Sequence, residues 1–569
     1  MLSVCAGLSA VFSRRLAPVA LGALAVSLAA ASAAGGAGSL VPTLTVTQTT
    51  AGLSSTASGG FEPPDVTVAA GPGFVVQLVN LAGRIWRTDA GAPQQVQTFT
   101  PATLFQSGGD RLTDPRILYD AASGRWFASI SDLDLDSVLV AVSRSADPTA
   151  GWNDVASFAA GGCADQPRLG IADGILVLAA DIFASCNQGF SPALGGELWI
   201  VNKQQLVAGA ATVSSTTYGP SRSYESLAPV QSLSATSTEY VVAVDNPSAR
   251  VVHLLAIDGI PPAAVRVQEI ASPPIAPLQQ PPRALQPPTG AGTRQPSIET
   301  NDNRILDSVW ENGKLWFSAN SGCVPSGDTA LRSCARVVEL STATKSVNWD
   351  TDIGQPGAYL FYPAIRPDAS GNLVVVYGES GVGELPRLLA LARAPDGSFS
   401  APAVIAQSAS AHERGRYGDY FGAARDPLHP DVVWVAGEHG VDVPGAHGWS
   451  STVAAVQATP AGDPPPEVRG IAPPGVRALS VAGRAGATIR LSYVALDEGS
   501  AVRRRVTVKA KNAVVFSTMT NAGRLNVAQS YSVAWHPVRR LRGTFTWCVQ
   551  TIAANGTESP QSCAGVILR

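Results

Sequence analysis

The chain has 569 residues, 45% of them hydrophobic and 15% charged, so it can bury a large core and form roughly two to four domains. Its net charge of −3 at pH 7 gives no overall attraction to nucleic acid or to acidic membranes, and neither is expected as a partner. The 55 glycines and 42 prolines separate short runs of Val, Ile, Leu, Trp and Tyr. This pattern favours many strands joined by turns and predicts an all-β fold.

Residues 1–34 have the pattern of an export signal. Arg14 and Arg15 precede the apolar run LAPVALGALAVSLAAASAA, and residues 31–33 form an A-x-A cleavage site. The run is rich in alanine and no basic stop-transfer flank follows it, which argues against a permanent membrane span. The sequence therefore predicts a secreted, extracellular or cell-surface protein.

A phrase of two apolar, strand-length runs joined by a turn recurs seven times between residues 61 and 460. Most copies are followed by a third alternating run, such as VLVAVSRS or RLLALARA. One small sheet cannot bury both of its faces, but sheets packed face to face in a ring can. We therefore predict a seven-bladed β-propeller, with six or eight blades as alternatives, in which the first run of each copy is the innermost strand. The copies begin at Pro63, Asp114, Gln166, Ala228, Asn303, Tyr362 and Asp419.

The remaining segments complete the predicted organisation. Residues 35–60 form a linker whose run TLTVTQTT could add a closing strand to the last blade. Between Gly259 and Gln295 the chain is too rich in proline for paired central strands and is expected to run over the surface. Residues 461–469 form a second linker, and residues 470–569 alternate in the two-residue rhythm of half-buried strands. That rhythm predicts a β-sandwich of the immunoglobulin or fibronectin type III kind.

Of the seven cysteines, Cys5 lies in the export signal and six remain in three couples that are close in sequence. Because export favours oxidation, we expect three disulfides. No C-x-x-C spacing or neighbouring histidine points to a cysteine-bound metal. The predicted pairs are Cys163 with Cys186, Cys323 with Cys334, and Cys548 with Cys563.

Residues at the start of the inner strands should line the axial channel of such a ring, so ligand-binding residues are sought there. Aligning the copies on their turns gives a set of equivalent positions, which are Asp65, Arg116, Arg168, Asp307, Ala364 and Gly422. In one interpretation the charged side chains pair around the axis or bind loop backbone, and so join neighbouring blades.

Two other interpretations give the same residues a ligand. The arginines could face a water-filled pocket and bind a carboxylate, as on an acidic sugar, beside a carboxylate that carries the proton. Alternatively, Asp65, Asp114, Asp165 and Asp419 could hold a hard cation such as Ca²⁺, which prefers oxygen ligands. No other cofactor is expected.

The densest polar stretch is HERGRYGDYFGAARDPLHPDVVWVAGEHG, residues 412–440. A tyrosine beside an acidic group can act on a sugar as a nucleophile with its acid/base partner. Tyr417, Asp419 and Glu413 are therefore candidate catalytic residues, and Arg416 is a further candidate for ligand binding. A glycine-rich strand entry with aromatic residues is also what packing between blades requires, which is the structural alternative.

The phrases SRSADPTAGW, YPAIRPDASGN and RYGDYFGAARDP resemble those of secreted bacterial propellers of the sialidase-like, BNR-repeat group. SADPTAGW is similar to the Asp-box S-x-D-x-G-x-T-W, with Ser145, Asp147 and Trp152 in place and the Gly and Thr positions different. The resemblance implies a propeller, because Asp-boxes stabilise outer turns and do not catalyse. The F-R-I-P pattern of true sialidases, which have six blades, is absent, and the nearest segment is Asp-Pro-Arg-Ile at residues 114–117.

Three functions follow from these observations. The leading hypothesis is a secreted binding or scaffold protein that recognises a carbohydrate or other extracellular ligand at the channel mouth. The second is a sialidase-like glycoside hydrolase or a polysaccharide lyase acting on acidic glycans. The third is an interaction protein whose ligand is another protein at the propeller rim.

Overall fold

A computed structural model describes residues 41–460 and 476–569. Shorter internal gaps fall at residues 90, 109–110, 188–189, 225, 245–248, 289–294, 442–447, 496–501, 512, 524, 526–529, 553–557 and 560. The predicted export signal and the predicted linker at residues 461–469 lie outside the described residues. In the described part of the chain, no helix is both long and apolar enough to cross a membrane.

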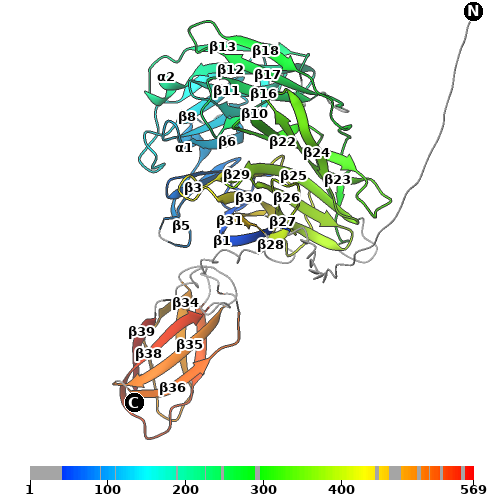
Figure 1. Cartoon of the computed structure of the whole chain (residues 1–569). Coiled ribbons are helices and arrows are strands. Elements are labelled where there is room, and N and C mark those ends of the chain that lie inside the picture. Colours follow the sequence, from blue (N-terminus) through cyan, green and yellow to red (C-terminus); the bar gives the residue numbers. More distant parts are fainter. Residues whose placement is uncertain are drawn as a thin grey trace, which may run out of the picture. The chain divides into compact units, whose positions relative to one another are not determined.

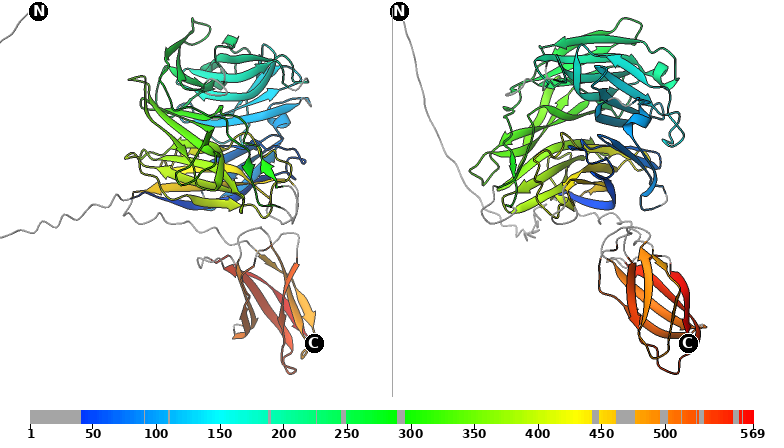
Figure 2. Two further views of the ribbon diagram at one scale, coloured as in Figure 1. Left: turned by 90° about the vertical axis from the view of Figure 1, so that its right-hand side faces the viewer. Right: turned by 180° about the vertical axis from the view of Figure 1, so that it is seen from behind.

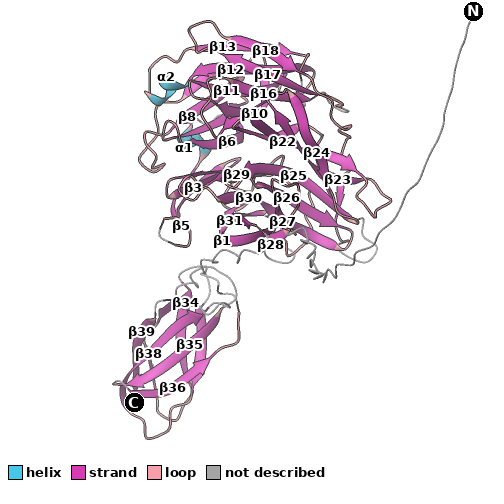
Figure 3. Ribbon diagram, in the orientation of Figure 1, coloured by secondary structure: helices cyan, strands magenta, loops and turns pink. Residues whose placement is uncertain are grey.

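The structure is all-β, as predicted, with two short helices among many antiparallel strands (Figure 3). Most strands up to residue 460 belong to consecutive four-stranded units, here called sheets 1 to 7 and written from the inner to the outer strand. Sheet 1 comprises β2 (Thr67–Gly71), β3 (Phe74–Val79), β4 (Ala82–Arg87) and β5 (Gln94–Phe99). Sheet 2 comprises β6 (Leu112–Asp120), β7 (Arg125–Asp132), β8 (Ser137–Val142) and β9 (Ala156–Ala159). Sheet 3 comprises β10 (Cys163–Ile171), β11 (Ile175–Phe183), β12 (Ala193–Asn202) and β13 (Ser215–Ser221).

The later sheets repeat this order. Sheet 4 comprises β14 (Ala228–Pro229), β16 (Glu239–Val244), β17 (Val252–Asp258) and β18 (Arg266–Ala271). Sheet 5 comprises β21 (Ile305–Glu311), β22 (Lys314–Cys323), β23 (Arg332–Ser341) and β24 (Ser346–Ile353). Sheet 6 comprises β25 (Ala358–Pro367), β26 (Leu373–Gly381), β27 (Glu384–Arg393) and β28 (Ala403–Gln407). Sheet 7 comprises β29 (Gly422–Arg425), β30 (Val432–Gly440), β31 (Ser450–Thr459) and β1 (Thr43–Ser54).

Short elements connect these sheets. β15 (Gln231–Ser232) pairs in parallel with β10 and β21 and so joins sheets 3 and 5. The proline-rich segment does not run wholly over the surface as predicted, because Arg266–Ala271 forms β18, the outer strand of sheet 4, and Leu278 is buried. β19 (Ala284–Leu285) pairs with β20 (Ser297–Ile298), which follows the segment. The helices are α1 (Pro101–Leu104) and α2 (Lys203–Val207).

The inner strands contact one another in cyclic order, from β2 through β6, β10, β14, β21, β25 and β29 back to β2. β1 closes the ring, because it pairs antiparallel with β31 from Thr43 opposite Thr459 to Ser54 opposite Ser450 (Figures 1 and 2). At the seam β29 and β2 approach so closely that a Cβ on Gly422 would lie 2.6 Å from the backbone N of Val68. Sheets arranged in a closed ring around an axis define a β-propeller.

Apolar side chains fill the space between neighbouring sheets. One cluster joins sheets 1 and 2 around the fully buried Trp126, and the largest joins sheets 6, 7 and 1 with β1. The outer strands are less covered, and β5 is mostly exposed. The segment that resembles an Asp-box connects β8 to β9, where Asp147 Oδ1 accepts a hydrogen bond from Thr149 N at 2.8 Å. In this structure it stabilises an outer turn.

Residues 476–569 form two sheets around one apolar core that contains Trp535 and Trp547. One sheet comprises β32 (Val476–Ala478), β34 (Ile489–Ala495) and β37 (Ser530–Trp535). The other comprises β33 (Val481–Gly483), β39 (Ser562–Leu568), β38 (Gly543–Ile552), β35 (Arg503–Ala510) and β36 (Ala513–Met519).

All three predicted disulfides are confirmed. Cys163 is bonded to Cys186, Cys323 to Cys334, and Cys548 to Cys563. The first holds the start of the inner strand β10 to the chain beyond β11, and the second spans the hairpin of β22 and β23. The third links directly opposed residues of β38 and β39. Each bond therefore stabilises a local pairing and joins no two sheets of the ring.

Candidate functional site: an axial cavity and an acidic cluster

A cavity of about 350 Å³ lies on the axis of the ring, and all seven inner strands contribute to its lining. Its rim includes the exposed residues Ala121, Asp173 and Ala235. Its charged lining residues include Arg116, Arg168, Asp307 and Arg366, on sheets 2, 3, 5 and 6. Three of the predicted ligand-binding residues therefore meet in one cavity. The sequence analysis missed Arg366.

Irregularities in the inner strands determine which side chains reach this cavity. The register of β6 shifts between Thr113 and Arg116, and that of β10 shifts between Asp165 and Arg168. At each bulge one residue has a positive φ, 59° at Asp114 and 47° at Gln166, and a proline follows it. A β-bulge redirects side chains locally, and the arginine two positions later is the first paired residue after the bulge.

Arg116, Arg168 and Arg366 are each held by another sheet, Arg168 and Arg366 by the next sheet in the ring and Arg116 by the segment before β29 of sheet 7. The guanidinium carbon of Arg116 lies 3.4 Å from the ring centroid of Tyr420. Arg168 Nη1 donates to Leu227 O at 3.3 Å, and Arg366 Nε donates to Ala423 O at 2.9 Å. The contacts of Arg168 and Arg366 are those expected if these residues join neighbouring blades.

These contacts leave several guanidinium donors without a hydrogen-bond partner in the described part of the chain, namely Arg116 Nε and Nη2, Arg168 Nε, and Arg366 Nη1. Burial lowers the pKa of Arg168 to about 10 and also lowers the pKa of Arg366. Nearby carboxylates neutralise part of the positive charge of these arginines, because Asp307 lies 3.4 Å from Arg366 Nη2 and Asp181 lies 3.8 Å from Arg168 Nη1. Buried donors of this kind favour an anionic ligand or ordered water.

A second group of charges lies near the start of the inner strands. Carboxylate oxygens of Asp65, Asp114 and Asp419 lie within 4.8 Å of one another, and all three residues are buried. Asp65 Oδ1 accepts a hydrogen bond from Asp419 N at 2.8 Å, and Asp114 Oδ2 accepts one from Gln166 N at 3.0 Å. We call Asp65, Asp114 and Asp419 the acidic cluster. It joins sheets 1, 2 and 7.

This geometry corrects the predicted alignment at Asp65. Thr67 is the first paired residue of β2, as Arg116 is the first after the bulge of β6. Asp65 is therefore equivalent to Asp114, two positions before the cavity-lining residue, and it belongs to the acidic cluster. Alignment on the turns could not reveal this, because the turn between β6 and β7 is two residues longer than the turn between β2 and β3.

Asp165 is set apart from the acidic cluster by an arginine. Arg304 Nη1 lies 3.9 Å from Asp165 Oδ2 and 3.4 Å from Asp181 Oδ2, while its Nη2 lies 2.8 Å from Asp302 Oδ2. Burial lowers the pKa of Arg304, but these three carboxylates more than offset burial and raise it. Burial and the neighbouring Asp114 raise the pKa of Asp165 well above its usual value.

The candidate catalytic residues lie in three different environments. Tyr417 has no exposed surface, does not line the axial cavity, and has a pKa raised by burial and by Glu438. Asp419 belongs to the acidic cluster and accepts a hydrogen bond from Arg416 Nη2 at 3.0 Å. Glu413 is exposed, and the side chain of Arg416 is 41% exposed. The structure therefore does not bring Tyr417, Asp419 and Glu413 together in one open pocket.

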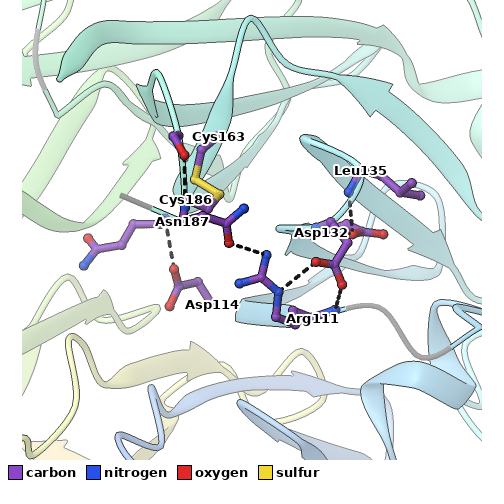
Figure 4. Close-up of a disulfide and its surroundings, with 10 residues drawn as sticks. Arg111, Asp114, Asp132, Leu135, Cys163, Cys186 and Asn187 are labelled. Atoms are coloured by element: carbon purple, nitrogen blue, oxygen red, sulfur yellow. Dashed lines mark hydrogen bonds and ion pairs between the residues drawn. A yellow bond between two sulfur atoms is a disulfide. The ribbon is translucent and has the colours of Figure 1, made fainter. Parts of the chain in front are cut away.

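Figure 4 shows the surroundings of the first disulfide. The Cys163–Cys186 bond lies at the start of β10, three residues before Gln166, whose backbone N donates to Asp114. Arg111, just before β6, donates from Nη2 to Asn187 Oδ1 at 3.1 Å. These contacts hold the starts of β6 and β10 beside each other, which places Asp114 and Gln166 for their roles in the acidic cluster.

Comparisons with known proteins show no family. No protein-family model and no curated protein matches the chain. A solved protein of unknown function from Dyadobacter fermentans is 12% identical, covering 74% of this chain and 100% of that one, with a TM-score of 0.34. An α-L-arabinofuranosidase from Fusarium graminearum is also 12% identical, covering 74% and 98%, with a TM-score of 0.33. An endo-arabinase from Bacteroides thetaiotaomicron is 12% identical, covering 60% and 92%, with a TM-score of 0.26. Likenesses of this size carry no argument for function.

Proposed function

We propose that this chain is an extracellular binding protein whose axial cavity holds an anionic group, such as the carboxylate of an acidic sugar. The observation that carries the proposal is the set of arginine donors without partners beside the cavity. A cavity of about 350 Å³ is at the lower end of the usual range of ligand pockets, roughly 300 to 1,000 Å³, and suits one small group.

In this proposal the seven sheets are the seven blades of one propeller of the sialidase-like kind, which presents the cavity. The C-terminal pair of sheets is an immunoglobulin-like or fibronectin-like sandwich that acts as a spacer. The three disulfides suit an oxidising compartment, and secretion by the predicted export signal would supply one. Protein binding at the rim is the alternative that an absence of glycan binding would favour.

Binding is preferred to hydrolysis because of the state of the carboxyl groups in the cavity. Glycosidases of the usual kind need two carboxyl groups facing the scissile bond, one of them free to carry a proton. Asp307 accepts a hydrogen bond from Ile365 N at 2.9 Å and faces Arg366, while Asp120 lies 3.0 Å from Lys203 Nζ. Both groups are occupied by structural contacts, and the third carboxyl of the lining, Asp173, lies alone on the exposed rim, so the cavity is better suited to recognition than to proton transfer.

Arg116→Ala tests the proposal most directly, because Arg116 is held by Tyr420 alone and makes no hydrogen bond in the described part of the chain. Losing one charge-assisted hydrogen bond costs roughly 1.5 to 3 kcal/mol. We expect calorimetric titration with galacturonate and glucuronate oligosaccharides to show binding that weakens about tenfold or more in the variant.

Arg87→Gln is the matched control, because it removes a charge from an arginine of β4 whose side chain is 45% exposed and which does not line the cavity. It should leave binding unchanged, and neutral oligosaccharides should not bind the wild type. Binding of acidic sugars that is equal in the wild type and Arg116→Ala would refute a cavity site. Sugar or unsaturated product released from the same panel would instead establish the hydrolase or lyase.

A further inference from the structure

The acidic cluster has more negative charge than its surroundings neutralise. Asp419 lies 3.0 Å from Arg416, but within the described residues neither Asp65 nor Asp114 forms an ion pair. Burial and the charges of Asp419 and Asp114 raise the pKa of Asp65 well above its usual value. Buried carboxylates at this separation repel one another and need a proton or a cation between them.

Gln166 supplies a second and independent sign of a ligand. Its side chain is 3% exposed, and in the described part of the chain its amide oxygen Oε1 has no hydrogen-bond partner. The nitrogen of the same amide donates to Asp419 Oδ2 at 3.0 Å, and the backbone N of Gln166 donates to Asp114 Oδ2 at 3.0 Å. Gln166 is therefore held against two members of the cluster, and its buried amide oxygen remains able to accept a ligand there.

We propose that Asp65, Asp114, Asp419 and the amide oxygen of Gln166 bind one calcium ion. Calcium takes oxygen ligands at about 2.3 to 2.6 Å, so two oxygens bound to the same ion can lie up to about 5 Å apart. Separations of up to 4.8 Å between the cluster oxygens fall within that range. Magnesium, with ligands at about 2.0 to 2.1 Å, requires a tighter and more regular set.

The site excludes Asp165, because Arg304 lies beside that carboxylate. Backbone N–H groups of Gln166 and Asp419 fix one oxygen each of Asp114 and Asp65. The three carboxylates come from sheets 1, 2 and 7, and the amide comes from sheet 3. A bound ion would therefore join four sheets across the seam where the first and last sheets of the ring meet. This inference does not depend on the proposed function of the cavity.

The test uses the whole mature protein, freed of divalent ions with a chelator and titrated with CaCl₂ by calorimetry and thermal unfolding. We expect one calcium per chain and a Tm that rises with calcium and returns when the chelator is restored. Asp114→Asn should weaken calcium binding about tenfold or more, because affinity follows the number of charged ligands. Its metal-free Tm should not fall, because the substitution also removes a repulsion.

Asp426→Asn is the matched control. Asp426 is a buried aspartate at the end of β29 that accepts hydrogen bonds from Leu428 N and Trp434 Nε1 and is not part of the cluster. It should lower the Tm with and without calcium and leave the calcium-dependent rise intact. Gln166→Met keeps the size of the side chain but lacks the amide oxygen, and it should also weaken calcium binding. It serves as the second test variant if Asp114→Asn does not fold.

Three outcomes would overturn the proposal. The first is a wild-type protein with no heat of binding and no Tm response to calcium. The second is a calcium response that survives in both Asp114→Asn and Gln166→Met. The third is an equal response to magnesium or to sodium at matched ionic strength, which would indicate screening of surface charge.

Discussion

The axial cavity and the acidic cluster use the same inner strands but opposite charges. On β6, Asp114 belongs to the cluster and Arg116 to the cavity, and on β10 the same relation holds between Gln166 and Arg168. Residues two positions apart in a strand normally point to the same side, but a bulge separates the members of each pair. The comparison shows how one short segment, repeated on neighbouring sheets, can build two sites with different chemistry.

The two sites also differ in how the protein compensates their charges. In the cavity, Arg168 and Arg366 are tied to carbonyl groups of the next sheet and lie near carboxylates. In the cluster, the members mainly accept hydrogen bonds from backbone and amide N–H groups, and only Asp419 has an arginine beside it. We therefore expect loss of a charge to destabilise the fold at the cavity and to stabilise the metal-free fold at the cluster.

Arg168→Ala should have the largest effect. Arg168 is 4% exposed, donates to Leu227 O, and lies 3.8 Å from Asp181. Its removal leaves the Leu227 carbonyl without this donor and leaves Asp181 with Arg304, at 3.4 Å, as its remaining partner, so the loss should be about 3 kcal/mol, the lower end for a broken buried ion pair. Denaturant unfolding should show a loss of this size. Arg116→Ala, which removes mainly the contact with Tyr420, should cost only about 0.5 to 2 kcal/mol. Equal losses of stability in Arg168→Ala and Arg116→Ala would contradict the larger structural role that we assign to Arg168.

Asp65→Asn should have an intermediate effect, and it should stabilise the metal-free protein. In metal-free protein at neutral pH it removes a buried charge that Asp419 and Asp114 repel. With an effective dielectric constant near 20, one such repulsion at 4.8 Å is worth about 3.5 kcal/mol. The lost hydrogen bond from Asn80 Nδ2 offsets about 1.5 kcal/mol or more of it, so the net gain should be about 1 to 2 kcal/mol. Denaturant unfolding in chelator should show a gain of this order, and the same experiment in calcium should show a smaller gain or a loss. A destabilised metal-free variant would mean that the cluster is already neutral in the native protein.

The pH dependence should give the smallest effect. The folded pKa of Asp65 is raised above its unfolded value of about 3.9, so the folded state binds this proton more tightly. The resulting stability is fully present below the unfolded pKa and is lost as the pH rises through the folded pKa. Asp165 and Glu438 shift in the same direction. The stability advantage of Asp65→Asn over the wild type, measured in chelator, should therefore grow from pH 4 to pH 8, whereas a constant difference would exclude titration of Asp65.

Local features of the fold could be predicted from the sequence because each is encoded within a few residues. The repeated phrase indicated the strands, and the spacing of Cys323 and Cys334 indicated a hairpin disulfide that the structure confirms. The equivalence of Arg116 and Arg168 also held, since both follow a proline at the same bulge. Arg366 was missed because it lies two positions beyond Ala364, the residue that alignment selected in that copy.

The convergence of distant residues could not be predicted in this way. Asp65 and Asp419 are 354 positions apart in the chain and meet only because the ring closes. The role of Gln166 could not be recognised, because nothing in its position before Pro167 distinguishes it in the sequence as a ligand residue. The one signal available was the recurrence of Asp-Pro, Gln-Pro and Tyr-Pro at the starts of β6, β10 and β25, where the first residue has a positive φ in each case. A residue forced into that conformation before proline marks a bulge, and so a redirected side chain.

Because β1 pairs with β31, the first and last strands of residues 41–460 close the ring. A ribosome delivers residue 43 first and residue 459 last, so sheet 7 cannot be completed until almost the whole ring has been synthesised. The sheets follow the same cyclic order in the chain and in space, so only the sheet at which the chain enters the ring could change. A permuted chain that starts at the turn between two other sheets, with residues 41 and 460 joined by a short linker, should rebuild the same ring. Its closing step would then fall at a different seam, away from the acidic cluster.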